Sequence, residues 1–113
     1  MATDLFAGIR VRDYHAARVW YERLLGREPA FFPYETEAVW ELGEHRYVYV
    51  TEDGERPGGA TITLFVEDLD ALVADIAFRG IEPVEQVTYS NGVRKVTYRD
   101  EDGNEIGFGG APA

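Results

Sequence analysis

Hydrophobic and polar residues alternate along the first segment of the chain, Leu5–Val11, and this period of two predicts a β-strand. Asp13 then fits the N-cap of a helix whose apolar stripe continues to Leu25. Gly26 fits the left-handed position at which many helices end. Three further strands are predicted at about Glu28–Tyr34, Glu37–Leu42 and Arg46–Thr51.

The same order of elements starts again after a polar segment, Glu52–Gly59, that contains three glycines and one proline. This composition predicts a linker, and we expect it to stay mobile because it has little to bury. Thr61–Val66 alternates like the first strand, Asp68 fits a second N-cap, and Gly80 closes the second helix. The last strands are predicted at about Pro83–Tyr89, Val93–Arg99 and Asn104–Gly109, with Asn91-Gly92 and Asp102-Gly103 as turn signals.

The two halves of the chain correspond closely. Val11-Arg12-Asp13 matches Val66-Glu67-Asp68 at an offset of 55, and Gly26 matches Gly80 at an offset of 54. Each half has the order β-α-β-β-β, and a half of roughly 50 residues would be only marginally stable by itself. We therefore expect an α+β fold in which residues 1–113 form one domain of two repeats, about 5–51 and 60–109. The eight strands should form a trough with the two helices on its outer face.

Composition and charge narrow the classes of function. The chain has no cysteine, which excludes disulfides, thiolate metal sites and a cysteine nucleophile. Its 21 acidic and 11 basic residues give a net charge of −10, which disfavours nucleic acid. No apolar run is long enough to span a membrane. We expect a cytoplasmic protein without nucleic-acid or membrane partners, in which His15 and His45 are ordinary surface residues.

Three short motifs resemble the vicinal oxygen chelate superfamily, which includes glyoxalase I, extradiol dioxygenases, fosfomycin resistance enzymes and bleomycin resistance proteins. Val11-Arg12-Asp13 precedes the first helix, and Trp20–Gly26 is similar to the family's Phe-Tyr-x-x-x-Leu-Gly. Asp100–Ile106 is similar to its Asp-Pro-Asp-Gly-Asn turn, with Glu101 in place of the proline. With the doubled β-α-β-β-β order, the resemblance extends from about Leu5 to Gly109. It implies the trough fold and raises the expectation of a homodimer.

The resemblance also implies where a metal ion would lie. Metal enzymes of this family hold a divalent ion in the trough with three or four His, Gln or Glu side chains. The corresponding positions here are Phe6, Thr61 and Gly107, with a fourth near Tyr47, Tyr49 or Glu52. Phenylalanine and glycine supply no side-chain ligand, a neutral threonine hydroxyl is a poor one, and catalytic sites usually need about three protein ligands. We therefore expect no metal and no other cofactor.

Strand parity predicts which side chains face the helices and which line the trough. Ile9, Val11, Ile62, Leu64, Val66, Ile106 and Phe108 share the parity that should face the helices. The opposite parity mixes large aromatic, small and polar residues, which suits a planar aromatic ligand and equally a dimer interface. Including Trp40 at the rim, the expected ligand-binding residues are Phe6, Arg10, Trp40, Tyr47, Tyr49, Thr61, Thr63, Phe65 and Glu105, with Gly8 and Gly107 providing room.

Three functions remain open at this point. The first is a metal-free protein, similar to bleomycin resistance proteins, that sequesters a planar small molecule, with a cationic one favoured by the acidic linker and Glu105. The second is a metal-dependent or unusual lyase, isomerase or dioxygenase, which only the resemblance supports. The third is a structural or regulatory interaction domain. The residues favour the first, and no catalytic residue is predicted.

Overall fold

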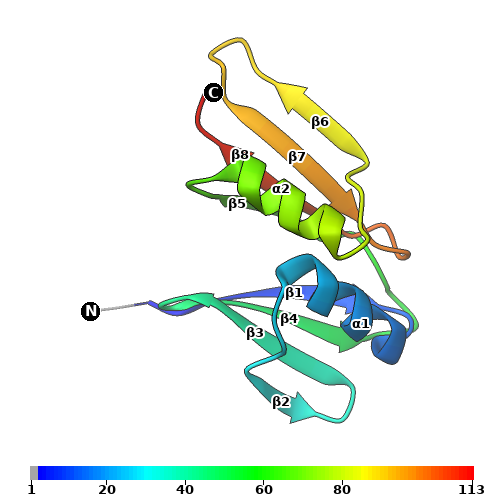
Figure 1. The fold of residues 1–113 in the computed structure, drawn as a ribbon. Coiled ribbons are helices and arrows are strands. Elements are labelled where there is room, and N and C mark those ends of the chain that lie inside the picture. The colour runs from blue at the N-terminus through cyan, green and yellow to red at the C-terminus, as the bar shows by residue number, and fades with distance from the viewer. Residues whose placement is uncertain (1–2) are drawn as a thin grey trace.

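A computed structural model describes residues 3–113 and contains two four-stranded sheets, each crossed by one helix (Figure 1). The first module consists of β1 (Leu5–Val11), α1 (Tyr14–Leu25), β2 (Phe31–Tyr34), β3 (Glu37–Gly43) and β4 (Arg46–Glu52). The second consists of β5 (Thr61–Phe65), α2 (Leu69–Phe78), β6 (Glu85–Thr88), β7 (Arg94–Arg99) and β8 (Glu105–Gly110). The expected α+β fold with a repeated β-α-β-β-β module is confirmed.

The two sheets have the same topology, with strand orders β1-β4-β3-β2 and β5-β8-β7-β6. In each sheet the first and last strands of the module pair in parallel, and the remaining pairs are antiparallel. The parallel registers correspond residue by residue, so that Phe6–Tyr47, Gly8–Tyr49 and Arg10–Thr51 match Thr61–Glu105, Thr63–Gly107 and Phe65–Gly109. Each position on these strands therefore has a defined counterpart in the other module.

The faces that the helices cover share one hydrophobic core. Ile9, Val11, Ile106 and Phe108 are buried in it, and the alternate residues of β5 pack against it. The strand parity predicted from the sequence is therefore correct for the helix-covered faces. Because the core includes residues of both modules and both helices, the burial of apolar surface that stabilises one module depends on the other.

Both helices begin and end where the sequence predicts. The Asp13 side chain accepts a hydrogen bond from the Ala16 N–H at 3.2 Å, and Asp68 does the same for Ala71 at 3.0 Å. Gly26 has φ +72° and Gly80 has φ +93°, the left-handed region that ends a helix with little strain only at glycine. Within residues 3–113, no helix is long and apolar enough to cross a membrane.

Two strands are shorter than predicted by more than one residue. β2 begins at Phe31 rather than at Glu28, and β6 extends over Glu85–Thr88 rather than Pro83–Tyr89. Pro29 and Pro83 lie in the missing segments, and a proline cannot donate a hydrogen bond to a sheet. Pairing starts only after them, with Ala30 N–H donating to the Val39 carbonyl at 2.7 Å and Val84 N–H to Thr97 at 2.8 Å.

The linker, which is expected to stay mobile because it has little to bury, makes backbone hydrogen bonds to β1. Asp53 N–H donates to the Val11 carbonyl at 2.9 Å, and Gly58 N–H donates to the Arg10 carbonyl at 2.8 Å. Gly58 is buried at φ +86°, where an added β-carbon would meet the Asp102 carbonyl oxygen. Glycine is needed here because the linker passes so close to another part of the backbone.

The turn before β8 joins the two modules. Asn104 is fully buried, and its amide nitrogen donates to the Arg10 carbonyl at 2.8 Å and to Asp100 at 2.9 Å. Its amide oxygen accepts from Ala60 N–H at 2.9 Å. The Tyr21 hydroxyl of α1 donates to Asp100 at 2.8 Å, and burial together with the Asp100 charge raises the pKa of Tyr21 above its usual range. The predicted hairpin turn is therefore also an inter-module connection.

Candidate functional site

The sheet faces turned away from the helices carry the candidate site, and we call them the open face. Alternation along the strands places on this face the residues that the sequence assigned to the trough. From the first module these are Phe6, Gly8, Arg10, Tyr47 and Tyr49, and from the second they are Thr61, Thr63, Phe65, Glu105 and Gly107. Eight of the nine predicted ligand-binding residues, all except Trp40, therefore lie on the sheet faces turned away from the helices.

An aromatic pair lies at the start of β1. The Phe6 and Tyr47 rings are stacked, with centroids 4.5 Å apart and planes at 9°, because the two residues are direct neighbours in the parallel register. Phe6 remains 47% exposed, so the pair presents apolar surface to solvent. Desolvation, and then the negative charges of Glu41 and Asp4, raise the pKa of the Tyr47 hydroxyl. The hydroxyl is therefore neutral at physiological pH.

Tyr49 lies across the neighbouring strand over Gly8. A β-carbon at Gly8 would lie 2.6 Å from both Cζ and the hydroxyl oxygen of Tyr49, so a side chain there would displace the ring. Beside the ring is a pocket of about 320 Å³, lined by Gly8, Arg10, Tyr49, Thr51, Gly58, Gly59 and Ala60. The fixed linker thus forms one side of a pocket whose other side is the open face of β1 and β4.

The second module presents a different lining. Phe65 is 68% exposed and its ring lies against Gly109, while Thr61 and Thr63 are also exposed. Glu105 accepts hydrogen bonds through Oε2 from the Arg99 guanidinium at 2.6 and 3.0 Å, so this carboxylate has a counter-ion within the protein. The ion pair weakens the attraction that Glu105 could exert on a cationic ligand.

Sequence reasoning missed Lys95, which belongs to the open face. Lys95 pairs with Gly109 in the β7–β8 register, and its Cε lies 2.6 Å from the point where a β-carbon of Gly107 would be. Two signals for it were present in the sequence. It alternates with Val96 along a predicted strand, and it is the only lysine of the chain.

Trp40 is not a residue of the open face, and its predicted place at the rim is wrong. It is 0% exposed and packs beside Tyr21 on the helix-covered side. Its indole N–H donates to the Arg27 carbonyl at 3.0 Å. The parity of β3 explains the error, because Trp40 is paired with Val48, a core residue, whereas its neighbour Val39 is paired with Tyr49.

The strand registers identify all four positions that the family resemblance associates with a metal ion. Gly107 pairs with Thr63, and the counterpart of Gly107 in the first module is Tyr49, which pairs with Gly8. The four positions therefore hold Phe6, Tyr49, Thr61 and Gly107. This set of side chains lacks the imidazole, amide and carboxylate groups with which family enzymes hold a divalent ion, and therefore does not fit one. Within residues 3–113, no three His, Cys, Asp or Glu side chains gather around one point.

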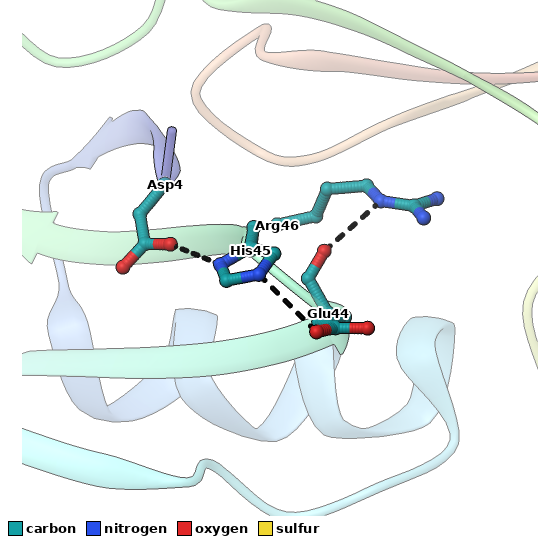
Figure 2. A network of polar contacts seen from close by, with 4 residues as sticks. All are labelled: Asp4, Glu44, His45 and Arg46. Carbon is teal, nitrogen blue, oxygen red and sulfur yellow. Dashed lines mark hydrogen bonds and ion pairs between the residues drawn. The ribbon is translucent and has the colours of Figure 1, made fainter. Parts of the chain in front are cut away.

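His45 forms a polar network at the β3–β4 turn, shown in Figure 2. Its Nδ1 lies 2.5 Å from Asp4 Oδ1, and its Nε2 lies 3.2 Å from Glu44 Oε1. Because the carboxylates contact opposite ring nitrogens, the three groups do not converge on a common ligand position. His45, at φ +65°, holds the segment before β1 against the turn, as expected of a surface histidine. His15 is exposed in the first turn of α1.

Comparison with known proteins supports the resemblance. A family model described as "Glyoxalase/Bleomycin resistance protein/Dioxygenase superfamily" matches residues 4–108. A crystal structure of a glyoxalase / bleomycin resistance protein from Catenulispora acidiphila is 55% identical, with TM-score 0.94 over 98% of this chain and 100% of that one. A superfamily member from Sphaerobacter thermophilus is 25% identical, with TM-score 0.73 over 97% and 98%.

The lactoylglutathione lyase from Agrobacterium tumefaciens, at 18% identity, shares the fold, with TM-score 0.74 over 97% of this chain and 94% of that one. Among curated proteins, none matches the chain. The family match includes both modules and the turn that joins them. The chain belongs to the glyoxalase/bleomycin resistance protein/dioxygenase superfamily.

Proposed function

We propose that the protein binds a planar small molecule on its open face without a metal ion. The observation that carries this proposal is the aromatic lining of the first module, where the Phe6–Tyr47 stack and the Tyr49 ring stand on the same sheet face. Flat aromatic faces beside a pocket of about 320 Å³ suit stacking against a planar ligand. Phe65 supplies a further exposed ring from the second module.

The residues at the family's metal positions support a metal-free site. Phe6 and Tyr49 place aromatic rings where metal enzymes of the family place ligands, and Gly107, which has no side chain, is covered by the Lys95 stem. These residues offer aromatic surface for stacking in place of metal ligands. The name of the 55% identical protein combines glyoxalase and bleomycin resistance, and binding without catalysis is the part that these residues favour.

The proposal includes a homodimer in which a second copy covers part of the exposed apolar surface. Leu5, Phe6 and Phe65 are each 47–68% exposed, and monomers rarely leave large apolar patches uncovered. Two-fold pairing is the commonest way for identical chains to cover such a patch. Light scattering at micromolar concentration tests this part. A mass near twice 12.7 kDa supports the dimer, and a mass near 12.7 kDa at all concentrations contradicts it.

Binding of a neutral planar probe tests the proposed function. Phenylnaphthylamine fluoresces on entering an apolar site, and its affinity should fall about tenfold or more in Tyr49→Ala and Phe65→Ala, because each removes a stacking ring. Phe78→Ala is the matched control, because Phe78 is a 93% exposed aromatic residue at the end of α2. Equal affinities in all three variants would remove the open face as the binding site.

A further inference from the structure

Lys95 and Thr63 bring polar groups to one point on the open face. From the position of a β-carbon at Gly107, Lys95 Nζ is 3.5 Å away and Thr63 Oγ1 is 3.4 Å away. The ammonium and the hydroxyl therefore lie above the same glycine, one from β7 and the other from β5. Gly107 is also the position at which the family resemblance places the last metal ligand.

The Lys95 ammonium has no counter-ion in the part of the chain that the structure describes. Within residues 3–113, the ion pairs involve other cations, and none includes Lys95. Its neighbours across the strands are Gly109 and Val87, which carry no charge. Lys95 is half-buried, so part of its hydration is lost. A partly desolvated ammonium without a carboxylate partner forms strong hydrogen bonds to an anionic oxygen.

Arg10 is a second cation of this kind. Its side chain lines the pocket of about 320 Å³ beside Tyr49. No ion pair in the described part of the chain includes the Arg10 side chain. Among the acids of this face, Glu105 is paired with Arg99, whereas Glu37, Glu41 and Glu85 form no ion pair in the described part of the chain. The case for an anionic group therefore rests on the local contacts of Lys95 and not on the summed charge of the open face.

We propose that the open face recognises an anionic oxygen group of the planar ligand, a carboxylate, sulfonate or phosphate, with Lys95 and Thr63 as its main contacts and Arg10 as a second cation. This inference rests on the proposed function and narrows its ligand class. Lys95 supplies positive charge in the part of the open face where family enzymes hold a metal cation. The overall acidity does not oppose it, since at physiological salt charges are screened beyond about 8 Å.

A purely structural role for Lys95 makes a different prediction. The methylene stem of a lysine often covers apolar or backbone surface while its ammonium stays in water. In that case Lys95→Met, which keeps the length of the stem, would preserve the packing contacts of residue 95 and would leave ligand affinity unchanged. In our proposal the same variant removes the group that binds the ligand.

Two probes with the same aromatic rings separate these possibilities. Anilinonaphthalene sulfonate carries an anionic group, whereas phenylnaphthylamine has the same rings without the sulfonate. Lys95→Met should weaken the anionic probe about tenfold or more, the usual loss for a charge-assisted hydrogen bond, and change the neutral probe less than about twofold. Lys95→Arg should retain most of the affinity for the anionic probe. Equal effects of Lys95→Met on the two probes, or none on the anionic one, would overturn the inference.

This experiment also separates failure of the inference from failure of the proposed function. If the neutral probe depends on Tyr49 but the anionic probe ignores Lys95, the open face binds planar molecules and the assignment of Lys95 is wrong. If neither probe depends on Tyr49 or Phe65, the open face is not the site and both proposals fail.

A direct spectroscopic readout is available because Lys95 is the only lysine. Reductive methylation with carbon-13 formaldehyde labels Lys95 and the α-amino group, and it keeps the charge. Lys95→Arg lacks one signal and so assigns it. The Lys95 signal should shift on titration with anilinonaphthalene sulfonate and stay unchanged with phenylnaphthylamine. A Lys95 signal that responds to neither probe would contradict a contact between its amine and the anionic group.

Discussion

The two modules have the same architecture but carry different chemistry on their open faces. At positions that face the helices, the counterparts are apolar in both modules: Ile9 and Leu64, Val11 and Val66, Val48 and Ile106, Val50 and Phe108. At positions on the open face, Phe6 corresponds to Thr61 and Tyr49 to Gly107. Packing against a helix restricts the first set to apolar residues, whereas the second set is free to vary.

This difference indicates where packing against the helices constrains both modules and where the modules are free to differ. A symmetric pair of sheets would give a symmetric site, with the same groups on both sides. Here the first module contributes most of the rings and Arg10, and the second contributes Phe65, threonine hydroxyls and Lys95. An asymmetric ligand, aromatic at one end and polar at the other, fits such a lining better than a symmetric metal ion does.

The modules also differ in how their last strands begin. Substituting the buried residue at this point of the second module should lower the stability of the protein the most. Asn104 is buried at the start of the second module's last strand, and its counterpart in the first module is Arg46, which is exposed. Asn104→Ala removes three hydrogen bonds and leaves the Ala60 N–H without a partner, whereas the Arg10 carbonyl keeps its bond from the Gly58 N–H. We expect a loss of about 3 kcal/mol in urea unfolding.

The control for this variant is Glu101→Ala, at an exposed position of the same turn, which should change stability by less than about 0.5 kcal/mol. Equal stabilities of the two variants would show that the turn does not hold the modules together.

The helix-ending glycines offer a second test of the comparison. A β-carbon at Gly26 would lie 2.9 Å from the Arg79 guanidinium, whereas one at Gly80 would meet nothing within 4 Å. Arg79 donates to the Arg23 and Leu24 carbonyls, so it caps α1 from the other module. Gly26→Ala should therefore cost about 2 kcal/mol, and Gly80→Ala only the backbone strain of about 1 kcal/mol. A larger loss for Gly80→Ala in thermal unfolding would contradict this cap.

Substitutions at two glycines of the open face should distinguish stacking on the aromatic rings from binding of an anionic group. Gly8→Ala pushes against the Tyr49 ring, and Gly107→Ala pushes against Lys95. The first should weaken neutral phenylnaphthylamine by roughly tenfold, and the second should weaken only the added affinity of anilinonaphthalene sulfonate. If both variants affect both probes equally, the two modules do not provide different kinds of ligand contact.

The smallest expected effect concerns Tyr21, whose counterpart in α2 is Ile76. Burial, and then the charge of Asp100, raises the pKa of Tyr21 in the folded state. Its contribution to stability is therefore present below about pH 10, the ordinary tyrosine pKa, and declines above it as the unfolded chain ionises. Tyr21→Phe should cost about 1 kcal/mol at pH 7 and make the alkaline decline less steep. Tyr34→Phe, at an exposed tyrosine, should leave the decline unchanged.

The sequence predicts the fold well because local signals carry it. Alternation, Asp13 and Asp68 as caps, and the paired glycines locate every helix and strand of the described chain, and the motifs add the family. The errors lie where contacts are distant. Trp40 was placed at the rim because its strand parity was not applied. The hydrogen bonds of the linker were not foreseen because they join residues far apart in sequence.

The site is less predictable than the fold for the same reason. Parity identifies Phe6, Tyr49 and Phe65 as open-face residues, but no local pattern shows that Glu105 is paired with Arg99 or that Lys95 leans over Gly107. These facts depend on side-chain directions across neighbouring strands. They are the basis on which we propose an anionic rather than a cationic ligand group.

The central claim is that the open face binds a planar ligand without a metal ion. Its most direct test is the affinity of the purified protein for phenylnaphthylamine before and after exhaustive dialysis against a strong chelator, with and without added divalent ions. We predict the same affinity under all conditions, and its loss in Tyr49→Ala. Binding that disappears on chelation and returns with a divalent ion would contradict the claim.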